Sequence, residues 1–214
     1  MKKSIFLAIL MVLSLSVFAQ YDPVALEILN AMSKKYKSIT AFEANISYSL
    51  TNETSKLNEV KKGKITVKGD KYRLVLPELE VINDGKTTWN YLPDANEVNI
   101  DNFDPNSKDL NPAKIYEIYK TGFKYAHMGE EKEDAVSCDV IELIPEKRSA
   151  ELGKIRMNIS KSDKSIVSWM IFDHAGNRFK YKISQFKANV KVEDSFFAFD
   201  KKKYPGVEEI DLRY

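Results

Sequence analysis

The chain has 214 residues, 43% of them hydrophobic and 30% charged, and this length suits one domain with a sizeable core. Its formal net charge of +2 is no larger than the contribution of Lys2 and Lys3, so the rest of the chain is balanced, which argues against nucleic acid or an acidic polymer as the main partner. The single cysteine, Cys138, excludes an intramolecular disulfide framework and a thiolate metal cluster, and a buried inert thiol is expected there.

The first 19 residues have the pattern of a secretory signal peptide. Two lysines precede an apolar run from Ile5 to Phe18, and Val17 and Ala19 occupy the small-residue positions of a cleavage site. The run is shorter than the about 20 apolar residues of a membrane-spanning helix, so an uncleaved anchor is the less favoured alternative. We expect cleavage after Ala19, a periplasmic location and one mature domain over residues 20–214.

A capped amphipathic helix is predicted at the start of the mature domain. Asp22 is a favourable N-cap, and Pro23 suits the first helical position because no hydrogen bond is lost there. Ile28, Met32 and Tyr36 recur at helical spacing and form one apolar stripe. This helix is expected to lie on an apolar surface.

From Thr40 onward the apolar period changes to two, which is typical of an antiparallel strand that is wet on one side. Alternation and turn signals predict strands at residues 42–50, 63–68, 71–76, 81–82, 87–92, 97–100, 123–128, 137–144, 154–160, 166–173 and 177–186. Gly69-Asp70 and the stretch 83–86 predict tight hairpin turns. The polar stretch 51–62 is expected to be a loop, and the charge run 130–134 a solvated hairpin tip.

A second helix is expected to interrupt the strands. Asn111 and Pro112 again place an N-cap residue before a proline at the first helical position, and Ile115, Ile118 and Tyr119 form an apolar face. The expected fold is therefore mainly β with α elements: one long antiparallel sheet, a helix before it and a helical insertion.

The sequence offers little of the chemistry that an enzyme needs. The two histidines, His127 and His174, have no nucleophile in a recognisable elbow nearby, and no zinc-protease, redox or phosphate-binding motif occurs. Asp101 and Asp104 resemble a loose calcium loop but lack its glycine and terminal glutamate. We expect no enzyme, no catalytic residue, no metal and no cofactor.

Aromatic and apolar residues are the abundant feature of the predicted strands. They favour a filled core, but a curved sheet capped by two helices can also enclose space for an apolar ligand. Periodicity alone leaves both interpretations open.

The order of motifs resembles the LolA family of outer-membrane lipoprotein carriers. The resemblance rests on the segments 42–46, 63–67 and 143–145, the closing residues 205–207, and above all Val81–Tyr91, which is similar to the family's "dGktlW-Y" pattern. It spans nearly the whole mature chain.

This resemblance implies an unclosed, strongly curved half-barrel, with an N-terminal helix and an inserted lid helix over an apolar cavity. It also implies a monomer that takes the acyl chains of lipoproteins from an inner-membrane ABC transporter of the Lol type to an outer-membrane acceptor. One departure concerns the lid. The family's carriers have an Arg-Pro pair after the second strand, whose arginine holds the lid closed, whereas this chain has Gly69-Asp70 there, and Arg73 is close but not at the matching position.

The residues expected to bind lipid are apolar or aromatic and lie on the two helices and the sheet lining. They are Ile28, Met32, Tyr36, Ile46, Tyr48, Leu74, Leu76, Trp89, Tyr91, Ile115, Ile118, Tyr119, Met157, Met170 and Phe172. The sheet residues depend on strand parity, which one bulge inverts. Three alternatives to a carrier remain: an envelope sensor or regulator that binds lipid or lipoprotein, an envelope lipid hydrolase, and a structural β-domain with a filled core.

Overall fold

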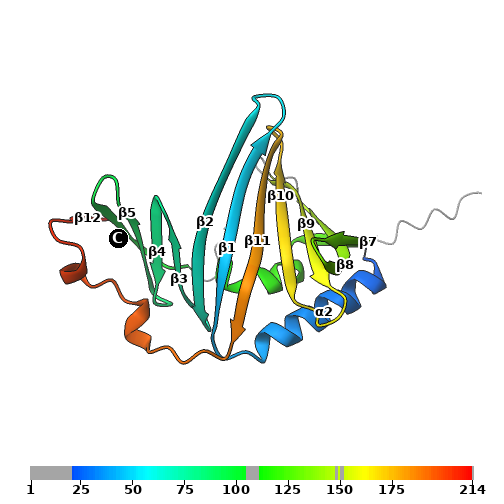
Figure 1. Cartoon of the computed structure of the whole chain (residues 1–214), viewed down its shortest axis with the longest axis horizontal. Helices are drawn as coiled ribbons and strands as arrows, with labels where there is room; N and C mark the ends of the chain where they lie inside the picture. The colour runs from blue at the N-terminus through cyan, green and yellow to red at the C-terminus, as the bar shows by residue number, and fades with distance from the viewer. Residues whose placement is uncertain (1–20, 105–110, 148, 150–151, 214) are drawn as a thin grey trace, which may run out of the picture.

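A single sheet of 12 strands dominates the computed structural model, which describes residues 21–104, 111–147, 149 and 152–213. The expected signal peptide, residues 1–19, lies outside the described residues. The strand order is β12-β6-β5-β4-β3-β2-β1-β11-β10-β9-β8-β7, and neighbouring strands are antiparallel except β12 and β6, which are parallel. The sheet is curved and its two edge strands do not meet (Figure 1). The prediction of a mainly β fold with one large unclosed sheet is confirmed.

The elements follow one another in chain order with short connections. The strands are β1 (Phe42–Asn52), β2 (Leu57–Lys68), β3 (Lys71–Leu76), β4 (Leu79–Asn83), β5 (Thr87–Leu92), β6 (Glu97–Asn102), β7 (Phe123–Glu133), β8 (Val136–Pro145), β9 (Leu152–Ser160), β10 (Ile166–Asp173), β11 (Asn177–Ala188) and β12 (Glu208–Asp211). The helical elements are α2 (Pro23–Lys37) and the 3₁₀ helices η1 (Pro112–Lys120), η2 (Asp194–Phe197) and η3 (Lys201–Lys203). No helix in the described part of the chain is long and apolar enough to cross a membrane.

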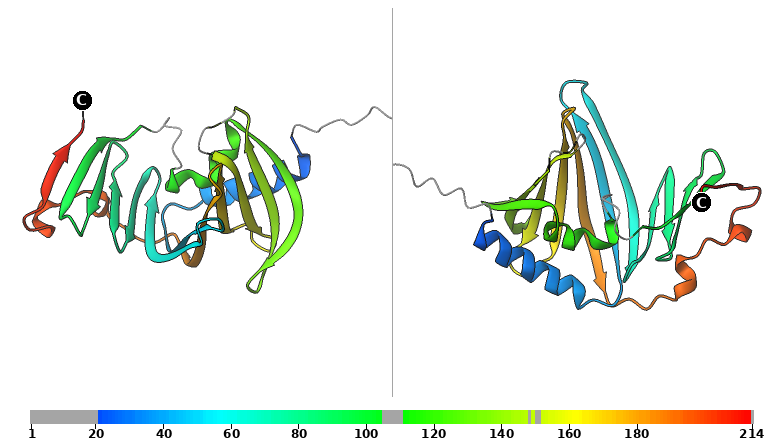
Figure 2. Two further views of the ribbon diagram at one scale, coloured as in Figure 1. Left: turned by 90° about the horizontal axis from the view of Figure 1, so that it is seen from above. Right: turned by 180° about the vertical axis from the view of Figure 1, so that it is seen from behind.

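Different segments cover the two faces of the sheet. Figure 2 shows α2 and η1 on one face, which we call the helical face, and the C-terminal segment 193–207 on the other. We call this C-terminal segment the strap and the face that it covers the strap face. The sheet end formed by β4, β5, β6 and β12 lies away from α2 (Figure 1), and we call it the wing.

α2 forms as the sequence predicts. The Asp22 Oδ1 atom accepts hydrogen bonds from the backbone N–H groups of Val24 (2.8 Å) and Ala25 (3.3 Å), and Pro23 occupies the first turn. The predicted apolar stripe is buried, with Met32 fully inaccessible to solvent. Because this stripe faces the sheet, α2 belongs to the main hydrophobic core.

β1 and β2 are longer than predicted, and the expectation of a loop over residues 51–62 was wrong. β1 continues to Asn52 and β2 begins at Leu57, so only a four-residue turn separates them. The Asn52 side chain shapes this turn, since its Oδ1 atom accepts hydrogen bonds from the N–H groups of Thr54 and Ser55. The first half of β2 is largely exposed, which removes the alternation that marks a strand in sequence.

η1 begins at the predicted cap, where the Asn111 Oδ1 atom accepts a hydrogen bond from Ala113 N–H at 2.9 Å. It is a 3₁₀ helix with a kink at Lys114 rather than a regular α-helix. Ile115 and Tyr119 are buried as expected, and Ile118 is partly buried against the same core.

The charge run 130–134 is not a simple solvated hairpin tip. The hairpin turn lies at its end, and Glu133 is buried against the strap face of the sheet. Its carboxylate lies 2.7 Å from Lys180 Nζ, and Asn158 Nδ2 donates a hydrogen bond to it at 2.8 Å. Burial alone would raise the pKa of Glu133, but the bonds from Lys180, Ser168 and Asn158 outweigh it and lower the pKa. The hairpin is thereby held across the strap face. Cys138, expected to be buried, is fully inaccessible to solvent.

The strap covers a second, smaller core on the wing. Val98, Ile100 and Val207 are buried there, with Trp89 and Tyr91 packed against them. The Arg73 side chain fastens the strap, since it donates hydrogen bonds to the Phe196 carbonyl (3.1 Å) and to Tyr204 Oη (3.0 Å), and its Nε lies 2.6 Å from Glu80 Oε1. The strap and β12 were not predicted as such, because β12 is short and acidic.

Candidate functional site

The helical face carries a continuous apolar surface. It is formed by helical-face side chains of β1–β4 and β7–β11 and by the inner sides of α2 and η1, and we call it the apolar trough. Its buried members form one cluster with Leu29, Met32, Ile141, Met157 and Ile159 at its centre. This cluster is the largest apolar surface that the described residues bring together.

α2 is held to the trough at both ends. At its start, the Asp22 Oδ2 atom accepts a hydrogen bond from His127 N–H at 2.9 Å, which ties the cap to β7. At its end, Tyr36 Oη accepts one from Ile166 N–H at 3.1 Å, and Lys35 Nζ lies 2.5 Å from Asp163 Oδ2. The Tyr36 hydroxyl is enclosed, and its burial raises its pKa to about 12.

η1 is held through side chains. Tyr119 Oη donates a hydrogen bond to Asn30 Oδ1 of α2 at 2.8 Å. Two ion pairs join the outer side of η1 to its neighbours: Lys37 with Glu117 at 2.8 Å, and Lys114 with Asp70 at 2.7 Å. The second pair connects η1 to the turn between β2 and β3.

Aromatic rings close the end of the trough where both helical elements meet the sheet. The Tyr36 ring stacks on Tyr116 of η1, with centroids 5.3 Å apart, and meets the rings of Phe42 and Phe186 edge-on. A hollow of about 170 Å³ lies beside them, lined in part by Ile39 and Val67. This volume is below the about 300 Å³ at which small-molecule pockets usually begin.

The other end of the trough extends beyond α2. β1 and β11 rise past the helix (Figure 1), and six residues beyond Phe42 the Tyr48 ring faces Tyr181, with centroids 5.2 Å apart. Tyr181 in turn stacks on Trp169 at 5.0 Å. Tyr48 and Tyr181 are only partly buried, yet burial raises the pKa of Tyr181 to about 12. This end therefore offers an aromatic apolar surface with partial access to solvent.

A larger hollow of about 400 Å³ lies on the strap face, between the β7–β8 hairpin and strands β1 and β11. Charged groups line it, including Lys180, Lys182, Glu133 and Asp134, which already form ion pairs with one another. It does not fit an apolar ligand.

The family model of the outer membrane lipoprotein carrier protein LolA matches residues 37–200 of the chain. The chain belongs to the LolA family. The resemblance found in the sequence is thereby confirmed. A comparison with curated protein sequences finds no match.

Solved structures resemble this LolA-family chain at low sequence identity. An uncharacterized conserved protein from Thermus thermophilus is 14% identical, with a TM-score of 0.59 over 88% of this chain and 99% of the other, and it shares the fold. The LolA superfamily protein NE2245 from Nitrosomonas europaea is 12% identical, with a TM-score of 0.41 over 82% and 97%. The MucA/MucB complex of Pseudomonas aeruginosa gives 11% identity and a TM-score of 0.49 over 83% and 62%.

Most residues that the sequence nominated for lipid binding lie together in the trough of this LolA-family chain. Those on the helical face are Ile28, Met32, Tyr36, Ile46, Tyr48, Leu74, Leu76, Ile115, Ile118, Tyr119 and Met157. Their lipid binding itself stays a prediction.

Four of the nominated residues lie on the strap face instead. Trp89 and Tyr91 pair with Ile100 and Val98, and they pack under the strap, so their assignment to the trough lining was wrong. Met170 and Phe172 alternate with Trp169 on β10 and also point to the strap face, where the Phe172 ring lies beneath Lys154 Nζ at 5.1 Å.

The physical reason is the same for both pairs. The wing has its covered side on the strap face, and β10 is apolar on both faces, so hydrophobicity does not fix strand parity there. Sequence reasoning also missed Phe42, Trp169, Tyr181 and Phe186 as trough residues, although their aromatic character was visible. Only the register shows that Tyr48 meets Tyr181.

Gly69-Asp70, the departure from the family's Arg-Pro pair, lies in the turn between β2 and β3. Asp70, which the resemblance matches to the proline of the family's Arg-Pro pair, forms the ion pair with Lys114 on η1. Arg73 points to the opposite face and holds the strap, so it does not substitute for the family's arginine.

Proposed function

We propose that the protein is a periplasmic carrier, and not an enzyme, that binds the acyl chains of lipoproteins in the apolar trough. In this role it accepts lipoproteins from a Lol-type ABC transporter in the inner membrane and delivers them to an acceptor in the outer membrane. The observation that carries the proposal is the trough itself: a long apolar and aromatic surface, partly accessible to solvent at the Tyr48–Tyr181 end, in a LolA-family chain.

The energetics of an acyl chain fit this surface. Each methylene that leaves water gains about 0.8 kcal/mol, so a chain of about 15 methylenes gains on the order of 12 kcal/mol on burial. The hollow of about 170 Å³ beside Tyr36 is too small for such a chain. Binding therefore requires one helical element to move away from the sheet.

η1 is the element that moves in this proposal, and it acts as the lid. α2 is tied to strand backbone at both ends through Asp22 and Tyr36. η1 is kinked, and the contacts that join it to α2 and to the β2–β3 turn are side-chain contacts: Tyr119 with Asn30 and Lys114 with Asp70. Displacing η1 uncovers Ile115 and Tyr119 together with the sheet side chains beneath them.

Acyl-chain binding is tested with two neighbouring substitutions on β3. Leu74→Glu places a charge on the helical face, whereas Val75→Glu places the same charge on the strap face, where Val75 is 43% exposed. We expect Leu74→Glu to weaken the binding of a fluorescent fatty-acid probe at least about tenfold. The bound acyl chain would exclude water from an unpaired carboxylate, and this costs free energy.

The matched variant Val75→Glu is expected to bind the probe like the unaltered protein, and circular dichroism melting of both variants reports on folding. Equal probe binding by all three folded proteins would contradict the trough as the acyl-chain site.

A further inference from the structure

The helical face changes character from the trough to the wing. Across neighbouring strands, Ala44 pairs with Ile65, Ile65 with Leu74 and Leu74 with Val81, and the row then continues into Asn90 and Asn99. A second row of paired positions runs Phe42, Val67, Tyr72, Asn83, Thr88, Asp101. Each of these two rows is apolar near the helices and polar at β5 and β6. A third row, through Leu76, Leu79 and Leu92, becomes polar at Glu97 of β6.

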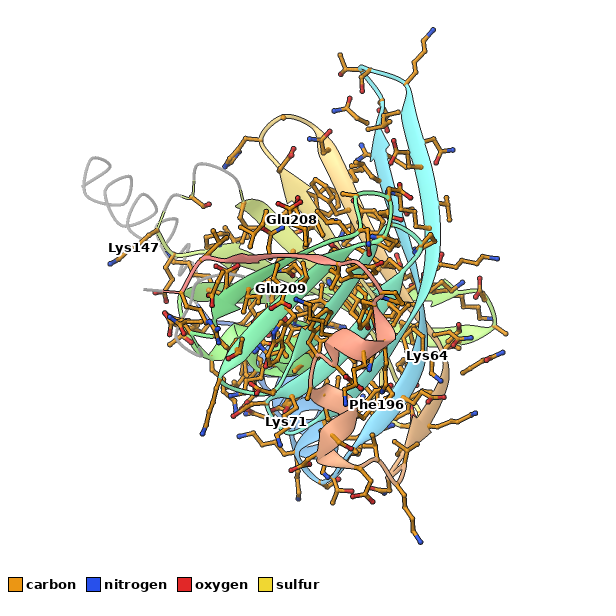
Figure 3. All side chains as sticks on the ribbon, turned by 90° about the vertical axis from the view of Figure 1, so that its left-hand side faces the viewer. Lys64, Lys71, Lys147, Phe196, Glu208 and Glu209 are labelled. Atoms are coloured by element: carbon orange, nitrogen blue, oxygen red, sulfur yellow. The ribbon has the colours of Figure 1, made fainter. Side chains whose placement is uncertain are left out.

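The polar end of this face is also acidic. Glu97 and Asp101 occupy helical-face positions of β6, and Glu208 on β12 pairs with Glu97 and faces the same way. Figure 3 looks onto this edge of the sheet and labels Glu208 and Glu209 on β12. Within the described chain, no lysine or arginine occupies a helical-face position of β4, β5, β6 or β12, and none of these three carboxylates forms an ion pair.

Side-chain amides lie between the apolar rows and the carboxylates. Asn90 and Asn99 face each other across β5 and β6, and both are partly accessible to solvent. An asparagine side chain both donates and accepts hydrogen bonds, as a peptide group does. Asn99 Nδ2 donates a hydrogen bond to Glu97 Oε1 at 3.0 Å, and its carbonyl oxygen has no hydrogen bond to another described residue. Asn83 differs, because it is buried and bonded to Thr88 Oγ1 (2.8 Å) and Gly85 N–H (2.7 Å).

The strap face of the same strands has the opposite character. There the wing buries Val98 and Ile100 beneath the strap. The wing is therefore folded and covered on one side, and it presents accessible amides and carboxylates on the side that continues into the trough.

We propose that this polar helical face of the wing binds the polypeptide segment next to the acylated residue of the cargo, and that it favours segments carrying lysine or arginine. The inference rests on the proposed function, because the trough must hold the acyl chains for the peptide to lie here. Amides match its peptide groups, and three carboxylates that form no ion pair with any described residue match its cations.

The size of the wing sets the length of the segment. Strands lie about 4.8 Å apart and an extended chain advances about 3.3 Å per residue, so the four spacings from β3 to β12 accommodate about six residues. A cargo would be recognised through the first residues of its own chain in addition to its lipid.

The test uses synthetic diacylated peptides with a six-residue segment, either lysine-rich or glutamate-rich, and a diacylglyceryl probe without peptide. Binding to the full mature chain is measured by fluorescence titration. We expect the lysine-rich peptide to bind about tenfold more tightly than the glutamate-rich peptide at low salt, and this preference to shrink near 1 M salt, where the screening length is about 3 Å.

The decisive variant combines Glu97→Gln, Asp101→Asn and Glu208→Gln. It is expected to lose the preference for lysine while it binds the peptide-free probe unchanged. A control variant of equal charge combines Glu27→Gln, Glu193→Gln and Glu209→Gln, all at exposed carboxylates. Glu209 lies on β12 but on its strap face, where it forms an ion pair with Lys201, and this variant is expected to keep the preference.

Three outcomes would overturn the inference. If the unaltered protein binds the peptide-free probe and binds both peptides with equal affinity, the wing does not recognise the peptide segment. If a diacyl lipid with a cationic headgroup and no peptide shows the same preference, the wing recognises a headgroup instead. If the peptide-free probe itself does not bind, the proposed acyl-chain binding is contradicted, and with it the inference that rests on it.

Discussion

The ion pair between Lys114 and Asp70 gives the sharpest test of η1 as the lid. The two groups lie 2.7 Å apart, and their side chains are 35% and 53% exposed. An ion pair this accessible stabilises by about 0.2–1 kcal/mol. The buried side chains Ile115 and Tyr119 hold η1 more strongly, because burying a large apolar side chain is worth about 1.5–3 kcal/mol.

Breaking the pair should therefore ease opening modestly. If the lid must open for a chain to enter, Lys114→Gln raises the apparent affinity for the fatty-acid probe by up to about fivefold, which corresponds to the about 1 kcal/mol upper limit of such a pair. Asp70→Asn should have the same effect, and the double variant should gain no more than either single change. High salt should remove the difference between the variants and the unaltered protein.

The control is Lys161→Gln, which breaks the ion pair between Lys161 and Glu130 on the β7–β8 hairpin. Its side chains are 39% and 56% exposed, close to those of the lid pair, but it lies away from η1. Unchanged affinity in Lys114→Gln and Asp70→Asn, or an equal rise in Lys161→Gln, would refute the assignment of the pair to the lid.

Two further predictions concern stability. Gly63→Ala should lower the free energy of unfolding by about 1–3 kcal/mol in denaturant titrations, since a Cβ atom there would lie 2.2 Å from the Val75 carbonyl oxygen; Gly153→Ala, with a nearest approach of 3.0 Å, should cost less, and equal losses would contradict the reasoning. Lys68 and Lys71 lower the pKa of Asp194 from 3.8 to about 2, so the stability that this carboxylate gives the strap is present above pH 3.8 and lost as pH falls through about 2. Above this range Asp194→Asn should have a lower free energy of unfolding than the unaltered protein, and the difference should disappear as the pH falls through it. A difference that does not depend on pH would contradict the assignment.

Local signals in the sequence predicted the elements that they govern directly. The Asp22 cap, the proline after it and the helical spacing of Ile28, Met32 and Tyr36 predicted α2 with its buried stripe. Turn residues likewise located most hairpins. These features depend on contacts between residues that are close in sequence, so they can be predicted from a single sequence.

Long-range features were predicted less well. The strap covers the wing on the face opposite to α2, and this reverses which side of β5 is buried, so Trp89 and Tyr91 were assigned to the wrong face. The kink at Lys114 and the parallel pairing of β12 with β6 also follow from tertiary contacts, and local sequence patterns do not predict such contacts. Glu133 was expected to be solvated for the same reason, because its partner Lys180 is distant in sequence.

The central claim is that this LolA-family protein carries lipoproteins in soluble form. The most direct measurement incubates the purified mature protein with spheroplasts and assays the supernatant for lipoproteins bound to it. The account predicts a soluble complex with the unaltered protein and with Val75→Glu, and much less with Leu74→Glu. Failure of the folded, unaltered protein to release any lipoprotein from the membrane would contradict it.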